Sequence, residues 1–385
     1  MHKILNFLNK NKLFLAMSLF AFCLSFDPDW SSKGLLIMLI LSTPLSKTKP
    51  PASVLKYIYV LFFIVIWGLI NMLLLSESIS FTSITTPLLT FLFLVLIKVY
   101  KKIMLKPITI FFTTGVFISG VINLITVFLK NENIDIFDSW AQYFIVDIHK
   151  TYYGAFLNIS LLLLFYLRST GQISYQIIRY IFPFYIIFLI SSGSIINLLI
   201  LILITAISVL YKFKSPYYKP LYVSFLCFPF LFFSYILISD DLTIISSLEN
   251  DSSRERNFHT SKQIIKKAPF YGHGIGEELN LLQKYRNKKS WEFNNNYNTH
   301  NQYFHFLIGG GVIYLIISFL PLLMINFKDN KIFENLFING FTLILIYIYL
   351  TETFQERHHG QMFYAFFLYL AILEKHHKEV INESI

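Results

Sequence analysis

The sequence has little charge and almost no cysteine. Only 14% of its 385 residues are charged, whereas 55% are hydrophobic and 18% are aromatic. The apolar residues form runs too long for the core of a soluble domain, so a bilayer is the expected solvent. The two cysteines, Cys23 and Cys227, both lie in apolar runs, which favours packing roles over a disulfide or a metal pair. A soluble domain, a low-complexity tract and an internal repeat are also lacking, so we expect one membrane domain over 1–385.

Long apolar stretches recur along almost the whole chain. A helix that crosses a bilayer needs about 20 largely apolar residues. The sequence therefore predicts an all-α polytopic membrane protein with about ten to twelve transmembrane helices, because four of the stretches are short or poorly bounded. The candidate spans are 13–26, 35–46, 54–75, 81–98, 107–129, 152–167, 177–190, 193–211, 220–238, 303–326, 335–350 and 361–373.

The formal charge of +10 is explained by membrane topology. The basic residues are not gathered into a folded polar domain, so nucleic acid is not an expected partner. They mark every second connection instead, and this positive-inside pattern predicts that both termini are cytoplasmic. No small-x-small cleavage site follows Cys23, so the first span is expected to stay uncleaved.

Two connections on the predicted outer face are long. They cover 130–151 and 239–302, and the second is the largest water-exposed segment. Its basic residues do not contradict the topology, because long loops cross a membrane regardless of their charge. Long ordered loops are usually functional, so we expect 239–302 to carry the active site.

His300 and Asn301 stand where the chain enters a predicted span. A histidine at the water interface is suited to act as the general base for a sugar hydroxyl. The alternative is an imidazole that only anchors the helix, followed by glycines that allow close packing. Taken alone, a His-Asn pair favours the anchoring role.

The spacing around His300 resembles that of the O-antigen ligase and polymerase family. The family pattern is His, then Asn, Ser or Gln, then nine residues, a Gly, two residues, and finally Gly, Thr or Tyr. This chain fits it with His300, Asn301, Gly311 and Tyr314. Upstream, Arg254 begins a stretch that looks like the family's arginine-led helix. The glycine-rich turn expected after that helix starts at Pro269 and contains Gly272, Gly274 and Gly276.

Weaker similarities lie outside this segment. Glu352 and Arg357 fall in a "TE…ER…G" stretch seen in some members, and His149 precedes Tyr152 and Tyr153 as in another family segment. The matches cover mainly 149–153 and 250–367. One departure is clear: where the family commonly has an arginine after a serine, this chain has Ser194 in a run without arginine.

The resemblance implies a membrane glycosyltransferase without a cofactor. Its donor would be a glycan on a polyprenyl (undecaprenyl) diphosphate, and its acceptor a hydroxyl of the lipid A core or of a growing glycan. It would lie in the bacterial inner membrane, in contact with membrane lipids, with the loop 239–302 in the periplasm. A ligase and a repeat-unit polymerase share this donor chemistry, and the His300 pattern favours the ligase.

The resemblance also suggests roles for individual residues. His300 would be the catalytic base and Glu352 would orient its imidazole. Arg254, Arg256 and Arg357 would bind the diphosphate, since planar guanidinium groups suit a concentrated negative charge. Each has an ordinary alternative: a solvated or headgroup-facing arginine, a surface acid for Glu352, and a pairing of Arg357 with a neighbouring glutamate.

No metal is expected. His358-His359 and His376-His377 are adjacent pairs that cannot both face one ion from a helix, and Asp240-Asp241 fits a helix end in water. A polysaccharide flippase or transporter is the alternative from another class. Transporters usually place ionisable residues near the middle of the membrane, whereas here the polar residues cluster toward one face.

Overall fold

The computed structural model describes residues 2–26, 28–42, 49–77, 80–97, 105–130, 149–238, 252–327 and 335–383. The helices that overlap the expected spans are α1 (His2–Cys23), α2 (Pro28–Ser42), α3 (Ala52–Leu75), α4 (Thr82–Leu96), α5 (Leu105–Lys130), α6 (Lys150–Ser169), α7 (Tyr175–Ser191), α8 (Ile195–Lys212), α9 (Tyr218–Ile238), α14 (Gln302–Phe327), α15 (Leu336–Ile348) and α16 (His358–Glu383). Between α9 and α14 lie α11 (Ser252–Lys267), α12 (Glu278–Tyr285) and α13 (Trp291–Asn294), and the 3-10 turn η1 (Phe354–Glu356) precedes α16.

The described residues form helices and turns and no strand. Five helices, namely α3, α5, α8, α9 and α14, are long and apolar enough to cross a membrane by length and composition. Large apolar side chains such as Leu74, Ile202 and Leu231 are exposed on their surfaces, as expected for helices in contact with lipid tails. The all-α polytopic class is therefore confirmed, while the number of spans stays a prediction.

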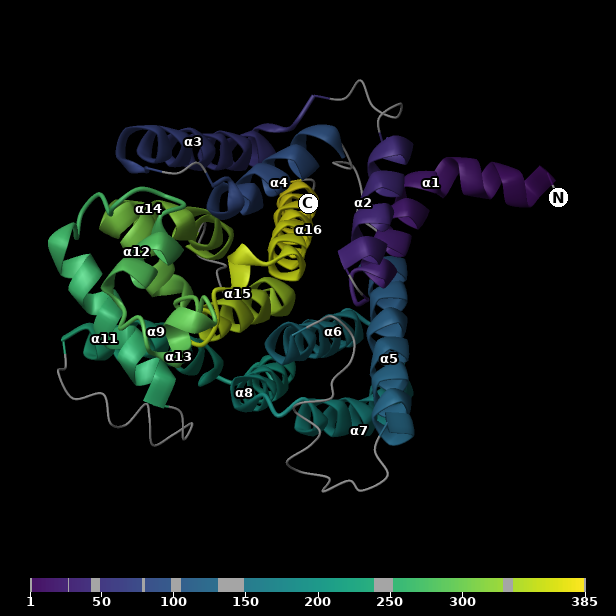
Figure 1. The fold of residues 1–385 in the computed structure, drawn as a ribbon. Coiled ribbons are helices and arrows are strands. Elements are labelled where there is room, and N and C mark those ends of the chain that lie inside the picture. The colour runs from purple at the N-terminus through teal and green to yellow at the C-terminus, as the bar shows by residue number, and fades with distance from the viewer. Residues whose placement is uncertain are drawn as a thin grey trace.

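The centre of the bundle is formed around α15, which contacts α6, α8 and α16 (Figure 1). Every residue of α15 is buried, which fits a helix that is apolar all round. α6 is also buried almost throughout although it is less apolar. Its polar side chains find partners inside the bundle, as where Asn158 donates to the carbonyl oxygen of Asn197 at 3.0 Å.

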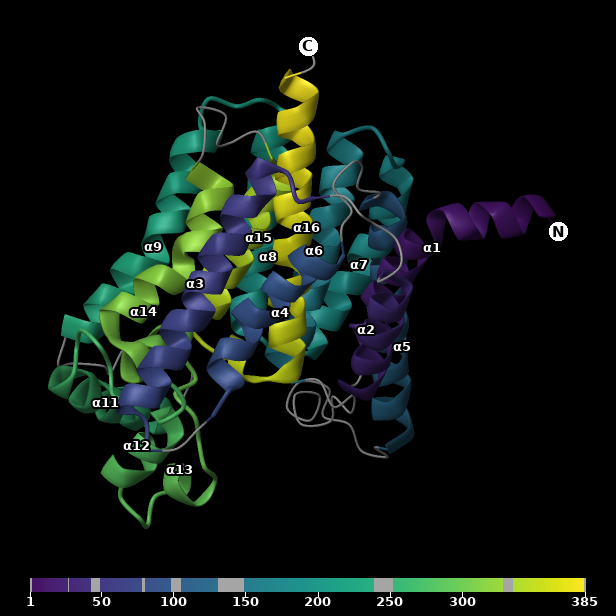
Figure 2. The same ribbon diagram turned by 90° about the horizontal axis from the view of Figure 1, so that it is seen from above.

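α11, α12 and α13 gather at one end of the bundle, beyond α3 and α14 (Figure 2). The apolar face of α11 packs against the protein: Phe258, Ile264 and Ile265 are all buried, and the Phe258 ring lies 5.0 Å from that of Phe304 on α14. α16 starts at the same end of the bundle, so the segment 252–301 lies near the turn that precedes α16. Residues 131–148 and 239–251, which belong to the two long connections, lie outside the described part.

Candidate active site

Glu352 lies between two histidines at the end of the bundle that carries α11 to α13. Its Oε2 atom is 3.5 Å from Nδ1 of His300 and 3.6 Å from Nδ1 of His149. His300 precedes α14, His149 precedes α6, and Glu352 follows α15. The side chain of Glu352 is inaccessible to solvent, so this carboxylate belongs to the interior.

The backbone of His300 has an uncommon conformation. Its φ of 45° lies in the left-handed region, which costs a non-glycine residue about 1 kcal/mol or more. Its amide N–H donates to Oδ1 of Asn298 at 3.0 Å, and its ring stacks on Tyr297 with centroids 4.0 Å apart. Nδ1 faces Glu352, while Nε2 has no hydrogen-bond partner among the described residues. The ring is therefore held in place with Nε2 as its open edge.

Hydrogen bonds fasten the start of α14 to the end of α15. Nδ2 of Asn301 donates to the carbonyl oxygen of Leu350 at 2.9 Å, and its Oδ1 accepts from the amide of Phe304 at 3.0 Å. The amide of Gln302 donates to the carbonyl of Tyr349 at 2.8 Å. Asn301 thus caps α14 and fixes the distance between His300 and Glu352.

The electrostatic surroundings keep Glu352 ionised. Burial alone would raise the pKa of its carboxyl, but hydrogen bonding and charge from His300, with His149 and Arg357, lower it below the ordinary value of 4.5. For His149, burial lowers the pKa to about 4, although the carboxylate of Glu352 opposes this shift. At neutral pH the site therefore holds a carboxylate beside a neutral His149.

His149 serves first as the cap of α6. Its Nδ1 accepts from the amide of Thr151 at 3.4 Å, so this nitrogen carries no proton when it faces Glu352. The next turn of α6 packs on the turn after Glu352: the Tyr152 ring stacks on Phe354 at 4.8 Å, and its hydroxyl donates to the carbonyl of Thr353 at 3.3 Å. These contacts hold α6 against the Glu352 turn.

The glycine-rich turn packs directly on a break in α14. Gly311 interrupts this helix with a φ of 65°, and Gly272 has a φ of 70°. The amide of Gly274 donates to the carbonyl of Gly309 at 2.9 Å. A Cβ at Gly272 would lie 2.3 Å from the Gly309 oxygen, and one at Gly311 would lie 2.2 Å from the Phe270 oxygen. Two motifs that are separate in the sequence thus form one backbone contact that admits only glycine.

The other side of the same turn rests on α3. Asn71 donates to the carbonyl of Tyr271 at 2.8 Å and accepts from the amide of Ile275 at 2.9 Å. Gly276, with a φ of 100°, lies against Ser80. Tyr314, the last residue of the His300 pattern, is buried on the same side of α14 and donates to the carbonyl of Ser83 at 3.1 Å. These contacts fix the backbone of the glycine-rich turn and the position of α14.

The three candidate arginines have different surroundings. Arg254 lies one turn before Asn257 on α11, and Asn257 donates to the carbonyl of Asn298 at 2.7 Å. Asn298 in turn holds the amide of His300, so this face of α11 borders the histidine. Arg256 is engaged elsewhere, because its guanidinium forms an ion pair with Glu292 at 2.6 Å.

Arg357 is exposed and forms no ion pair with the described residues. Its charge acts on both Glu352 and His149, as their altered pKa values show. The glutamate next to it in the sequence, Glu356, pairs with a histidine instead. Arg357 therefore leaves a free positive charge beside the Glu352 carboxylate.

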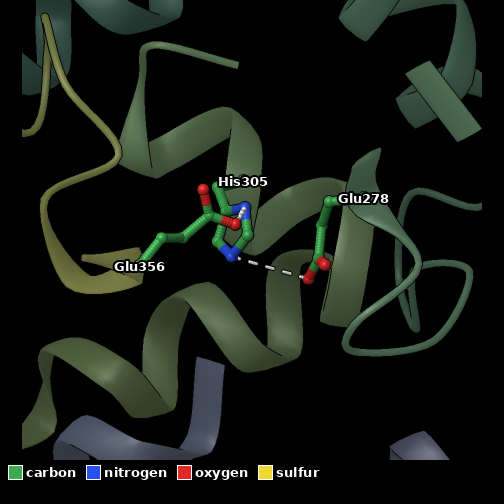
Figure 3. A group of neighbouring side chains, drawn as sticks. All are labelled: Glu278, His305 and Glu356. Carbon is green, nitrogen blue, oxygen red and sulfur yellow. Dashed lines mark ion pairs between the residues drawn. The ribbon is translucent and has the colours of Figure 1, made fainter. Parts of the chain in front are cut away.

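A second cluster of ionisable side chains is formed by Glu278, His305 and Glu356 (Figure 3). Nδ1 of His305 is 3.0 Å from Oε1 of Glu356, and its Nε2 is 3.6 Å from Oε1 of Glu278 and 3.0 Å from the hydroxyl of Ser83. Burial raises the pKa of Glu278 despite the opposing charge of His305. For Glu356, burial is outweighed by the charge of His305, which lowers the pKa of the carboxyl.

The cluster of Glu278, His305 and Glu356 has the composition of a metal site, since one oxygen or nitrogen of each lies within 4.8 Å of the others. However, the two carboxylates face opposite nitrogens of one imidazole (Figure 3). An ion needs both carboxylates on the side of the nitrogen that binds it. This arrangement fits an imidazole that bridges two acids and joins α12, α14 and η1.

The model of the O-antigen ligase family matches residues 180–319. This segment is similar to that family. It contains Arg254, the glycine-rich turn, His300, Asn301, Gly311 and Tyr314. His149 and Glu352 lie outside the matched segment and reach the site through the packing of α6 and α15. No curated protein matches the chain.

The matched segment also includes the turn where this chain lacks the arginine that the family commonly has. Ser194 lies in the turn between α7 and α8 and accepts from Nδ2 of Asn197 at 2.8 Å. Nδ2 of Asn197 also donates to the carbonyl of Thr151, two residues from His149, at 3.1 Å. The turn therefore borders the site, and Arg357 supplies a positive charge in the same region.

The sequence did not point to three residues that shape this site. Glu278 and His305 were not singled out, because their pairing depends on how α12 lies against α14. Asn298 lies in an asparagine-rich stretch, but it links α11, His300 and the turn after Glu352: its Nδ2 donates to Thr353 at 2.6 Å. A signal was available for His305 alone, since an ionisable residue within an apolar span requires a partner.

Proposed function

We propose that this membrane protein is an O-antigen ligase-like glycosyltransferase. It moves a glycan from a polyprenyl (undecaprenyl) diphosphate to an acceptor hydroxyl such as one of the lipid A core. The observation that carries the proposal is the pair formed by His300 and the buried Glu352 within a family-matched bundle. A base oriented by a buried acid is what activation of an alcohol requires.

The roles of the pair follow from its geometry. Oε2 of Glu352 lies 3.5 Å from Nδ1 of His300, and a carboxylate at this nitrogen favours the tautomer with the proton on Nδ1 and an unprotonated Nε2. Nε2 takes the proton of the acceptor hydroxyl while its oxygen attacks the anomeric carbon of the donor. The new glycosidic bond forms as the bond between that carbon and the diphosphate oxygen breaks. Such base catalysis contributes about 10²–10⁴-fold to a rate.

The leaving diphosphate needs positive charge. The α11 face that carries Arg254 reaches His300 through Asn257 and Asn298, and exposed Arg357 lies close enough to lower the pKa of Glu352. We assign these guanidinium groups to the two ends of the diphosphate, so that Arg357 takes the place of the arginine missing near Ser194. Arg256 contributes to the field of the site while it remains paired with Glu292.

The reaction also sets the orientation of the chain. A lipid-linked donor that has crossed the membrane meets the site from the periplasmic side of the bacterial inner membrane. We therefore place the loop 239–302 in the periplasm and both termini in the cytoplasm, in agreement with the distribution of lysine and arginine. Labelling of single cysteines at exposed positions such as Trp291 and Lys214 tests this orientation.

Deletion of the gene tests the function itself. Loss of all long glycans from lipid A, with accumulation on the carrier, is the result expected for a ligase. A single repeat unit left on lipid A indicates a repeat-unit polymerase, which shares the donor chemistry. Unaltered envelope glycolipids contradict both. Complementation with His300→Ala at normal membrane levels then tests the base, and restored long glycans would show that His300 is not required.

A further inference from the structure

A cavity of about 560 Å³ lies between α6, α7, α8 and the start of α15. It is far from the proposed active site. α6 begins beside His149 and ends at Ser169, next to the cavity, while α15 runs from Leu336 at the cavity toward Glu352. The 13 residues of α15 span about 20 Å, so the two sites lie at opposite ends of the bundle.

Three positive side chains surround the cavity: Arg168, Arg179 and Lys212. None of the described residues that line it is acidic. Arg168 and Lys212 lie in the last turns of α6 and α8, where a cation offsets the helix dipole. That explanation fails for Arg179, which lies near the start of α7, where the dipole favours negative charge. Three cations around one cavity, with no acidic residue in its described lining, indicate that it binds an anion.

Much of the cavity lining is apolar. It includes Phe165, Ile178, Phe182, Val209 and Leu336. Ligand cavities are usually a few hundred Å³ in volume, apolar inside, and equipped with a few polar groups that fix one end of the ligand. This wall suits a hydrocarbon chain held below a charged head.

Two hydroxyl groups between the wall and the cations are unused. Oγ1 of Thr205 and Oγ of Ser208 line the cavity, and neither forms a hydrogen bond with the described residues. Most buried polar groups have a partner, so these two hydroxyls add unused hydrogen-bonding capacity to the lining of the cavity.

We propose that this cavity binds one anionic phospholipid from the leaflet opposite the active site. The phosphate lies among Arg168, Arg179 and Lys212, and one acyl chain follows the apolar wall. Tyr175 and Tyr180 on α7 are 58% and 69% exposed, as is common for tyrosines at the level of lipid headgroups. Basic pockets between transmembrane helices are suited to such headgroups.

Native mass spectrometry of the full chain in detergent tests this proposal. Phosphatidylglycerol should bind with a stoichiometry of one, and phosphatidylcholine with the same chains should bind far more weakly. The double variant Arg168→Gln/Arg179→Gln should weaken phosphatidylglycerol binding roughly thirtyfold, given the usual contribution of two cations at a membrane surface. The matched control Lys49→Gln/Lys106→Gln removes two exposed cations outside the cavity and should leave binding unchanged.

A second variant separates the lipid from a simple anion. Thr205→Phe fills the cavity without altering its charge, so it should reduce lipid binding although the cations remain. Inorganic phosphate at millimolar concentration should not displace the lipid. Equal binding of both phospholipids, equal losses in the two double variants, or full displacement by phosphate would each overturn the proposal. The test is independent of glycan transfer, so it holds whatever the catalytic activity proves to be.

Discussion

Nδ1 of His300 lies 3.5 Å from Oε2 of Glu352, in a place where the carboxylate is closed to solvent. A buried carboxylate is stable only if a charge or a hydrogen bond compensates its lost hydration. Here the compensation comes from the imidazole that is proposed to accept the proton of the acceptor hydroxyl. The same contact therefore stabilises the acid and orients the base.

Glu352→Gln should lower glycan transfer by about 10²-fold or more, because the amide does not stabilise the charged imidazolium during the reaction. Transfer is measured on membranes with a lipid-linked donor, at equal protein levels. Glu77→Gln, which changes an exposed acid after α3, is the matched control and should retain full activity. Unchanged transfer by Glu352→Gln would show that this acid does not assist His300.

Arg254→Gln should reduce transfer by about 10²–10³-fold, as the loss of one stabilising group for a developing negative charge usually does. Arg254→Lys should recover only part of the activity. It keeps the positive charge but lacks the planar guanidinium group that can donate two hydrogen bonds to one phosphate. Lys266→Gln on the same helix removes an exposed cation near the far end of α11 and serves as the control. Equal effects of Arg254→Gln and Lys266→Gln would argue against a specific diphosphate contact.

The stability of the protein should fall between pH 6.5 and about 4 because of His149. Its pKa is about 4 in the folded state, against an ordinary value of 6.5, so the unfolded chain binds a proton first as the pH falls. This contribution is fully present above pH 6.5 and is lost toward pH 4. His149→Asn keeps a capping side chain but cannot titrate, so its melting temperature should depend less on pH. Parallel pH profiles for the two proteins would contradict this.

Gly311→Ala should destabilise the protein by more than the roughly 1 kcal/mol that a left-handed residue costs alone. The added methyl group would meet the carbonyl oxygen of Phe270 at 2.2 Å. Gly171→Ala is a matched control, because Gly171 has a φ of 73° with no atom within 4 Å of its Cβ position. Thermal unfolding in detergent compares them. Equal losses would mean that strain alone, and not the close backbone contact, sets the need for glycine.

His305→Leu should destabilise the protein by about 3 kcal/mol, because it leaves the buried carboxyl of Glu278 and the half-buried carboxylate of Glu356 without their shared partner. The added change Glu278→Gln removes one of these acids and should recover part of the loss. Urea unfolding of the single and double variants measures this coupling. Strictly additive effects would show that His305 and Glu278 do not interact.

Much of the fold followed from apolar runs, since α3, α5, α8, α9 and α14 are each long enough to be recognised alone. The ends of α6 and α16 were harder to predict, because their polar side chains interrupt the apolar pattern. In the structure these side chains find partners on neighbouring helices. The spacing from His300 to Tyr314 identified the family segment that was then found by comparison. The pairing of His305 with Glu278 and Glu356 was not predictable, because it depends on how three distant segments pack.

The stacking of Tyr297 on His300 limits how an acceptor can reach the base. Tyr297 covers one face of the imidazole, and Glu352 occupies the Nδ1 edge. An incoming alcohol must therefore arrive in the plane of the ring and along the Nε2 direction. Such a single approach would distinguish one hydroxyl of a sugar from its neighbours by direction, before any contact with the rest of the sugar contributes.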